Sequence, residues 1–113
     1  MRLYASFMLF LLPVFSPSSA LAAGVRDDLM EKIADVVALA RVCPSLEMDT
    51  VSVTTIAIGQ QIGRHRRDYE VIDAMANARE GEMRRGDAPS ACESGRRQYG
   101  PGGLTVPGLL RER

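Results

Sequence analysis

The stretch Cys43-Pro44-Ser45-Leu46 decides how this chain folds, because Cys43 has a single possible intramolecular partner, Cys92. In an oxidising compartment the two thiols should join and close a loop of about 50 residues. By the chain-entropy estimate, closing a loop of that length stabilises the fold by about 4 kcal/mol at most. Redox-active cysteines usually stand two residues apart, so we interpret this distant pair as structural. The sequence therefore predicts short helices folded beneath one disulfide.

The N-terminal residues predict export from the cell. Arg2 supplies a positive start, residues 3–15 form an apolar run, and proline and small residues follow. This order is typical of a secretory signal peptide, which we assign to residues 1–22 with cleavage after Ala20 or Ala22. The run is shorter than the roughly 20 apolar residues that cross a bilayer, so no stable membrane anchor is expected after cleavage. Residues 23–113 should then form a single helical domain in the bacterial periplasm or outside the cell.

Composition narrows the class of protein further. The 113 residues include 14 Lys and Arg against 14 Asp and Glu, so the chain lacks the basic surplus of a nucleic-acid binder. Apolar residues make up 46% and charged residues 25%, which is typical of a globular protein rather than a disordered one. We therefore expect a folded domain that does not bind nucleic acid.

A first helix is predicted over residues 24–42. Asp27 or Asp28 should cap its start, and Pro44 should end it because proline disfavours helical geometry at the preceding residue. Asp28 and Lys32 are spaced to form an ion pair one helical turn apart. Apolar residues at three- and four-residue spacing should form one buried face: Leu29, Ile33, Val36, Val37, Ala40 and Cys43.

Residues 47–62 leave two alternatives open. The β-branched residues between Thr50 and Ile58 suit a strand, but their alternation fails at residues 54–56 and no second strand is evident to pair with them. A lone strand cannot satisfy its backbone hydrogen bonds, so we predict a helix. Helical spacing would place four residues of this segment on one side: Val51, Thr55, Ile58 and Ile62.

Two further helices and a tail complete the expected fold. Asp68 should cap a helix over residues 69–85 that ends at Gly86, with an apolar stripe of Tyr69, Ile72, Met75, Ala76 and Met83. Asp87 should open a short fourth helix that ends at Gly100. The tail from about residue 100 is expected to be irregular, with four apolar residues lying back over the helices: Leu104, Val106, Leu109 and Leu110. The predicted fold class is all-α, a small bundle of about four short helices clamped by one disulfide.

The residues that carry enzyme chemistry are sparse. His65 is the only histidine, and both thiols are committed to the disulfide, so no ordinary zinc site can be assembled. No spacing supports a nucleophile with a base and an orienting carboxylate, and we predict neither catalytic residues nor a metal or cofactor. The one local charge cluster is Arg64-His65-Arg66-Arg67. Two interpretations remain open: an exposed loop offset by nearby acids, or a contact for lipid headgroups, a polyanion or an acidic protein face.

Several short motifs resemble those of small exported two-cysteine helical proteins of bacteria: Cys43-Pro-Ser-Leu46 with Asp49, then Cys92, Tyr99-Gly-Pro-Gly-Gly103 and Pro107-Gly-Leu-Leu110. The resemblance covers most of the exported part and implies a fold and a location, but no activity. The size and the single long-range disulfide are also similar to those of small periplasmic acid-stress chaperones, although this chain lacks their lysine-rich character.

Two functions follow as hypotheses. The first is a non-enzymatic exported protein that acts through contact with an unidentified protein partner, in an oligomeric state that the sequence leaves open. The second is an acid-activated holdase chaperone, in which protonation of Asp and Glu loosens the helices and exposes their aliphatic faces.

Overall fold

A computed structural model of the chain describes residues 17–113, with side chains from Gly24 onward. Most of the predicted signal peptide lies outside these residues. The described elements follow one another as α1 (Pro17–Val42), β1 (Leu46–Met48), α2 (Thr50–Gly59), α3 (Arg66–Arg85), α4 (Ala88–Tyr99) and β2 (Leu110–Glu112). None of the four described helices combines the length and the apolar character needed to span a bilayer.

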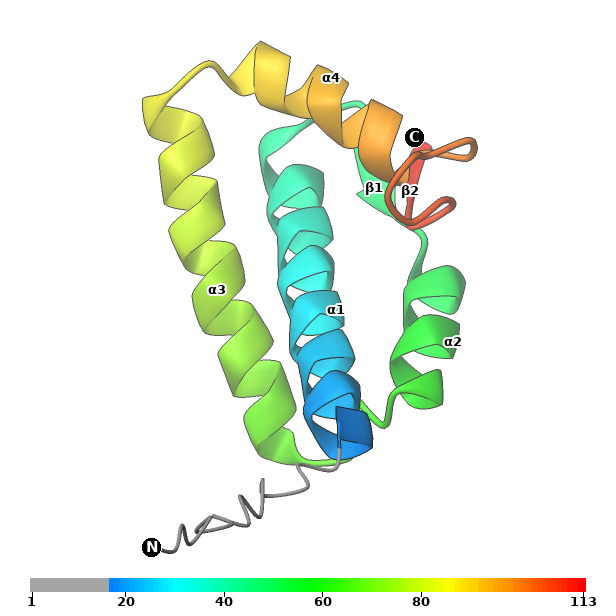
Figure 1. Cartoon of the computed structure of the whole chain (residues 1–113). Coiled ribbons are helices and arrows are strands. Elements are labelled where there is room, and N and C mark those ends of the chain that lie inside the picture. Colours follow the sequence, from blue (N-terminus) through cyan, green and yellow to red (C-terminus); the bar gives the residue numbers. More distant parts are fainter. Residues whose placement is uncertain (1–16) are drawn as a thin grey trace, which may run out of the picture.

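Helix α1 is the centre of the arrangement, with α3 on one side and α2 on the other (Figure 1). α1 and α3 run in the same direction and make the most extensive contact between any two elements. α2, which lies between them in the sequence, runs in the opposite direction. α4 crosses the end of α1 where Cys43 lies, and the Cys43–Cys92 disulfide joins these two parts of the chain. The predicted helical fold and its covalent clamp are therefore both confirmed.

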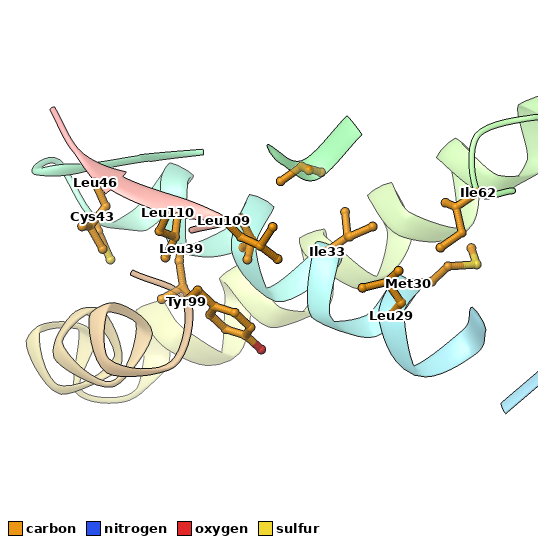
Figure 2. Close-up of a cluster of buried hydrophobic side chains, with 12 residues drawn as sticks. Leu29, Met30, Ile33, Leu39, Cys43, Leu46, Ile62, Tyr99, Leu109 and Leu110 are labelled. Atoms are coloured by element: carbon orange, nitrogen blue, oxygen red, sulfur yellow. The ribbon is translucent and has the colours of Figure 1, made fainter. Parts of the chain in front are cut away.

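The hydrophobic core follows the length of α1 (Figure 2). At one end Ile62 lies near Met30, and at the other Leu46, Leu109 and Leu110 gather around Leu39. The predicted face of α1 is largely correct, since Leu29, Ile33, Val36 and Cys43 are all buried. Met30, Ala34, Ala38 and Leu39 are buried too, because α1 is covered from several sides. One long helix thus supplies most of the apolar surface around which the shorter elements pack.

The local capping signals hold in the second half of the chain. The Asp87 carboxylate accepts a hydrogen bond from the Ser90 N–H at 3.1 Å and caps α4, as predicted. Gly86 ends α3 and Gly100 ends α4, also as predicted. The ion pair between Asp28 and Lys32 is present as well.

Two capping predictions are wrong. α1 begins at Pro17, so Asp27 and Asp28 lie inside the helix and cannot cap it. α3 begins at Arg66 after His65, and Asp68 lies in its first turn rather than at its cap. The Asp68 carboxylate is instead used in a tertiary contact, which explains why its local role could not be read from neighbouring residues.

The segment of residues 47–62 is helical over Thr50–Gly59, which confirms the predicted helix, but the residues predicted to share one side differ in burial. Val51 and Ile58 are 77% and 69% exposed, whereas Val53 is buried. The residues just before the helix form β1, which pairs antiparallel with β2 in the register Leu46 to Glu112 and Met48 to Leu110. The C-terminal tail therefore ends in a short strand after an irregular stretch, and Leu109 and Leu110 return to the core while Leu104 stays 87% exposed.

Candidate functional site

An open apolar groove of about 590 Å³ lies between α1, α2 and α3. α1 provides its floor with Ile33 and Val37, α2 one wall, and Tyr69 and Ile72 of α3 the other. We call this surface the groove, and its complete lining is Ile33, Val37, Met48, Thr50, Val53, Thr54, Ala57, Ile58, Gln61, Ile62, Gly63, Arg64, Tyr69 and Ile72. Its volume falls within the roughly 300–1,000 Å³ of typical ligand pockets. The groove is the candidate functional site.

The composition of α2 explains why the groove is apolar. Val51, Val53, Ile56 and Ile58 are distributed around the helix, so a single contact face cannot bury them all. Val53 is buried against the core, Ile56 is partly buried, and Ile58 is left at the edge of the groove. The helix therefore presents apolar surface that the described part of the chain does not cover.

The N-terminal end of α2 is held by Asp49. Its carboxylate accepts a hydrogen bond from the Ser52 N–H at 3.0 Å, and its own N–H donates to the Leu109 carbonyl oxygen at 2.8 Å. Hydrogen bonding from Ser52 keeps the pKa of Asp49 below its ordinary value. This residue therefore connects the start of α2 to the C-terminal tail.

The C-terminal end of α2 is held by Asp68, whose carboxylate is almost completely buried. Asp68 accepts a hydrogen bond from the Arg26 guanidinium at 2.7 Å and another from the Gly63 N–H at 2.9 Å. The hydrogen bond from Arg26, assisted by that from Gly63, lowers the pKa of Asp68 despite its burial. Asp68 thus joins α1 and the first turn of α3 to the loop that follows α2.

Gly63 shapes the corner of the groove between this loop and α3. Its φ of 91° lies in the left-handed region, which glycine adopts without steric cost. A β-carbon at this position would lie 2.7 Å from the Tyr69 hydroxyl oxygen. The glycine therefore lets the loop turn closely against Tyr69, whose ring is 63% exposed and forms part of the groove wall.

The four residues of the predicted basic cluster lie on different surfaces of the protein. All four are exposed, and Arg64 alone among them lines the groove. Arg66 lines an adjoining open hollow of about 460 Å³, which shares Val37, Tyr69 and Ile72 with the groove. Arg66 also lies 3.8 Å from Glu70, a long contact between two exposed groups. Arg64 is therefore the member of the cluster best placed to act together with the apolar lining.

A second group of titratable side chains lies away from the groove, between α1, α3 and α4. The Tyr99 hydroxyl donates to Asp35 Oδ2 at 3.3 Å, and Arg79 lies 3.2 Å from the other oxygen of Asp35. Burial raises the pKa of Asp35, and it raises the pKa of Tyr99 to about 12 together with the nearby Asp35 charge. The three partners satisfy one another, so this cluster has a structural role in joining the helices.

Neither a metal centre nor a known family accounts for the groove. Within residues 17–113, no three His, Cys, Asp or Glu side chains gather closely enough to bind a metal ion. Comparison of the chain with models of protein families, with curated proteins and with solved structures finds no match. The function must therefore be argued from the chemistry of the site.

Sequence reasoning found Arg64 but missed the rest of the groove. Ile33 and Val37 were expected on one face of the first helix, and Ile58 was expected to share a side of its helix with Val51. One signal was available: α2 carries apolar residues around its whole circumference, more than one contact face can bury. The groove forms only when α1, α2 and α3 pack together around this excess apolar surface. Local sequence patterns do not encode that packing.

Proposed function

We propose that the protein is a non-enzymatic binding protein, exported to the periplasm or the cell exterior, which holds apolar side chains of a protein partner in the groove. One observation carries the proposal. An apolar surface open to solvent lies between three helices, although the same helices bury an apolar core along α1. Exposed apolar surface of this kind typically marks an interaction site, because leaving it in water is unfavourable.

The chemistry of the lining favours binding over catalysis. Its titratable groups are Arg64 and Tyr69, and within the described lining no carboxylate or imidazole accompanies them. General acid–base work normally requires such a group within hydrogen-bond reach of the reacting atoms. The groove instead resembles an interface core, with apolar walls and a charged rim.

Export is supported by the disulfide and by the N-terminal sequence. Disulfides form and persist in oxidising compartments, and the Cys43–Cys92 bond joins α4 to the end of α1. The order of charge, apolar run and small residues in the first 22 residues is that of a signal peptide.

Site-specific photocrosslinking tests this function. A benzophenone amino acid replaces Ile58, which lines the groove, and in a matched variant it replaces Val51, which is similarly exposed on α2 but outside the groove. We expect position 58 to crosslink one protein of the exported fraction, identified by mass spectrometry, that position 51 does not. The purified pair must then form a complex that Ile58→Asp weakens at least tenfold. The same crosslinks from both positions, or no complex between the purified proteins, would remove the proposal.

A second candidate, the acid-activated holdase, is favoured by the attachment of α2. Asp49 holds one end of this helix and Asp68 the other, and hydrogen bonds lower the pKa of both carboxylates. As pH falls through the folded pKa values of Asp49 and Asp68, both of which lie below 3.8, protonation weakens both attachments and frees the apolar underside of α2. The test is light scattering of a denaturing client at pH 3 and pH 7. If the protein is a holdase, an equimolar amount must reduce aggregation of the client at pH 3. If the client aggregates to the same extent with and without the protein, this candidate is excluded.

The contact between Arg26 and Asp68 also predicts how stability depends on pH. The pKa of Asp68 is lower in the folded chain than its ordinary value of 3.8. The unfolded chain therefore binds the proton more readily, so the stabilisation is complete above that value and is lost as pH falls through the folded pKa. We expect Asp68→Asn to lower the melting temperature by roughly 5–10 °C at pH 7 and by much less at pH 3.

Asp73→Asn is the control for this measurement. Asp73 also lies on α3 and pairs with an arginine of α1, Arg41, but its side chain is 61% exposed. Exposed ion pairs contribute little, so the variant should melt within about 2 °C of the parent. Asp35, whose raised pKa acts in the opposite sense, is present in every variant and cancels in the comparison. Circular dichroism melts at both pH values provide the data. If Asp68→Asn lowers the melting temperature as much at pH 3 as at pH 7, the pH-dependent role of Asp68 is wrong.

A further inference from the structure

The groove lies where an additional helix would pack. α1 forms the floor, α2 and α3 form the walls, and α4 lies across one end instead of filling the space (Figure 1). Helical bundles bury apolar surface by packing each helix into the groove between its neighbours. An amphipathic helix laid in such a groove is also a recurrent mode of peptide recognition. The position that remains open therefore has the shape of a helix-binding site.

We propose that the groove binds an amphipathic α-helix of the partner protein, apolar along one face and acidic at the end that meets Arg64. This inference rests on the proposed function and names the chemistry of its partner. The apolar face would present residues at positions i, i+3 or i+4, and i+7, and these would pack against Ile33 and Val37 of α1 and Ile58 of α2.

Charge sets the orientation of the bound helix. α2 carries no charged residue, so its wall is electrostatically neutral along its length. The loop after α2 is different, because Arg64 lies in the groove lining and His65, Arg66 and Arg67 follow it directly. Two of the acidic residues near this loop pair with arginines of α1, since Asp68 binds Arg26 and Asp73 binds Arg41. The third, Glu70, lies 3.8 Å from Arg66.

Within the described residues, Arg64 has no carboxylate at ion-pair distance. A carboxylate of the partner at this end would therefore gain a guanidinium that is free to bind it, beside the apolar lining that the rest of the partner helix would cover.

The charged residues beside the groove favour a helix over a single acyl chain. The adjoining hollow shares Val37, Tyr69 and Ile72 with the groove and continues over α3, where Glu70 and Asp73 stand beside Arg66. The apolar residues of the hollow all belong to the groove, and its other lining residues, Arg66, Glu70 and Asp73, are charged, so a purely apolar acyl chain would find no polar partner for them. A helix about 10 Å in diameter covers both, and its polar face can meet charges of either sign at the rim.

Fluorescence anisotropy with three labelled 18-residue peptides tests the proposal on the full oxidised chain. All three share one leucine face at helical spacing. One has three glutamates at its N-terminal end, one has them at its C-terminal end, and one has lysines in both places. We expect one of the acidic peptides to bind at least tenfold more tightly than the lysine peptide. Circular dichroism of each protein variant checks that it is folded.

Two matched pairs of variants locate the binding site. Ile58→Asp should lower the affinity for the acidic peptide at least tenfold. Val51→Asp, on the same helix but outside the groove, should change that affinity less than twofold. Arg64→Glu should reverse the preference between acidic and lysine peptides. Arg67→Glu makes the same charge change three residues away but outside the groove lining, and should leave the preference unchanged.

Each of the following outcomes would overturn the inference. Equal affinity for acidic and lysine peptides removes the charge contact, and equal effects of Arg64→Glu and Arg67→Glu reduce it to general electrostatic attraction. One-to-one binding of palmitate without binding of any peptide assigns the groove to a lipid instead. If the peptides fail but the protein captured from position 58 still forms its complex, only the helical and acidic character of the partner is wrong. Failure of both experiments removes the proposed function as well.

Discussion

Replacing Cys43 and Cys92 together with alanine should lower the free energy of unfolding by about 4 kcal/mol. The bond joins residues 49 apart in the sequence, so its loss returns to the unfolded chain the freedom of a long loop. Domains of this size have about 5–10 kcal/mol of stability in total, so the variant should be close to unfolding at 37 °C. Because Cys43 is completely buried, the small void left by alanine adds to the loss.

Urea titration followed by circular dichroism measures this difference. The control is the parent protein with its disulfide reduced, which should unfold near the same urea concentration as the double variant because both lack the crosslink. Mass spectrometry under non-reducing conditions should find the parent two hydrogens lighter than its dithiol form. An unchanged melting temperature for the double variant would mean that packing alone, without the disulfide, holds the helices together.

Leu109→Ala should lower the free energy of unfolding by about 3 kcal/mol. Leu109 is completely buried, although it lies in a tail rich in glycine and proline. Its side chain belongs to the core at the end of α1 (Figure 2). Its carbonyl oxygen accepts the hydrogen bond from the Asp49 N–H that fixes the start of α2. The substitution opens a cavity where α1, α2 and the β1–β2 pair meet, so the lost packing affects several elements at once.

Leu104→Ala is the matched control for this prediction. Leu104 belongs to the same tail and is the same residue type, but 87% of its surface is exposed. Its replacement should change the free energy of unfolding by no more than about 0.5 kcal/mol. Urea titration of both variants compares them directly. Similar losses for the two leucines would mean that the tail contributes nothing specific to the core.

Local signals were sufficient where a single residue type has one physical role. Pro44 cannot follow a helical residue without strain, and α1 ends at Val42, two residues before it. Asp87 and Gly86 are residues that favour helix termini, and α4 and α3 begin and end beside them. Two cysteines allow only one intramolecular pairing, so the disulfide followed from their number and from the predicted export.

Local signals failed where a residue serves a distant part of the chain. Asp68 is a good helix-capping residue, but α3 begins two residues before it and its carboxylate binds an arginine 42 positions earlier. β1 was invisible from its three residues, since its partner β2 lies some 60 residues later and a strand gains its hydrogen bonds only by pairing. Spacing alone could not show which side of α2 is buried, because apolar residues surround the helix and its orientation depends on what lies beneath it.

Composition and local pattern were thus enough to identify a helical domain with one disulfide and with most of its helix ends. They also identified the basic cluster that contains Arg64. The groove, the strand pair and the burial of Asp68 arose only when distant segments were brought together around α1. The reason is physical: a cap or a helix stop depends on neighbouring residues, whereas a groove is the space left between surfaces that meet only in the folded chain.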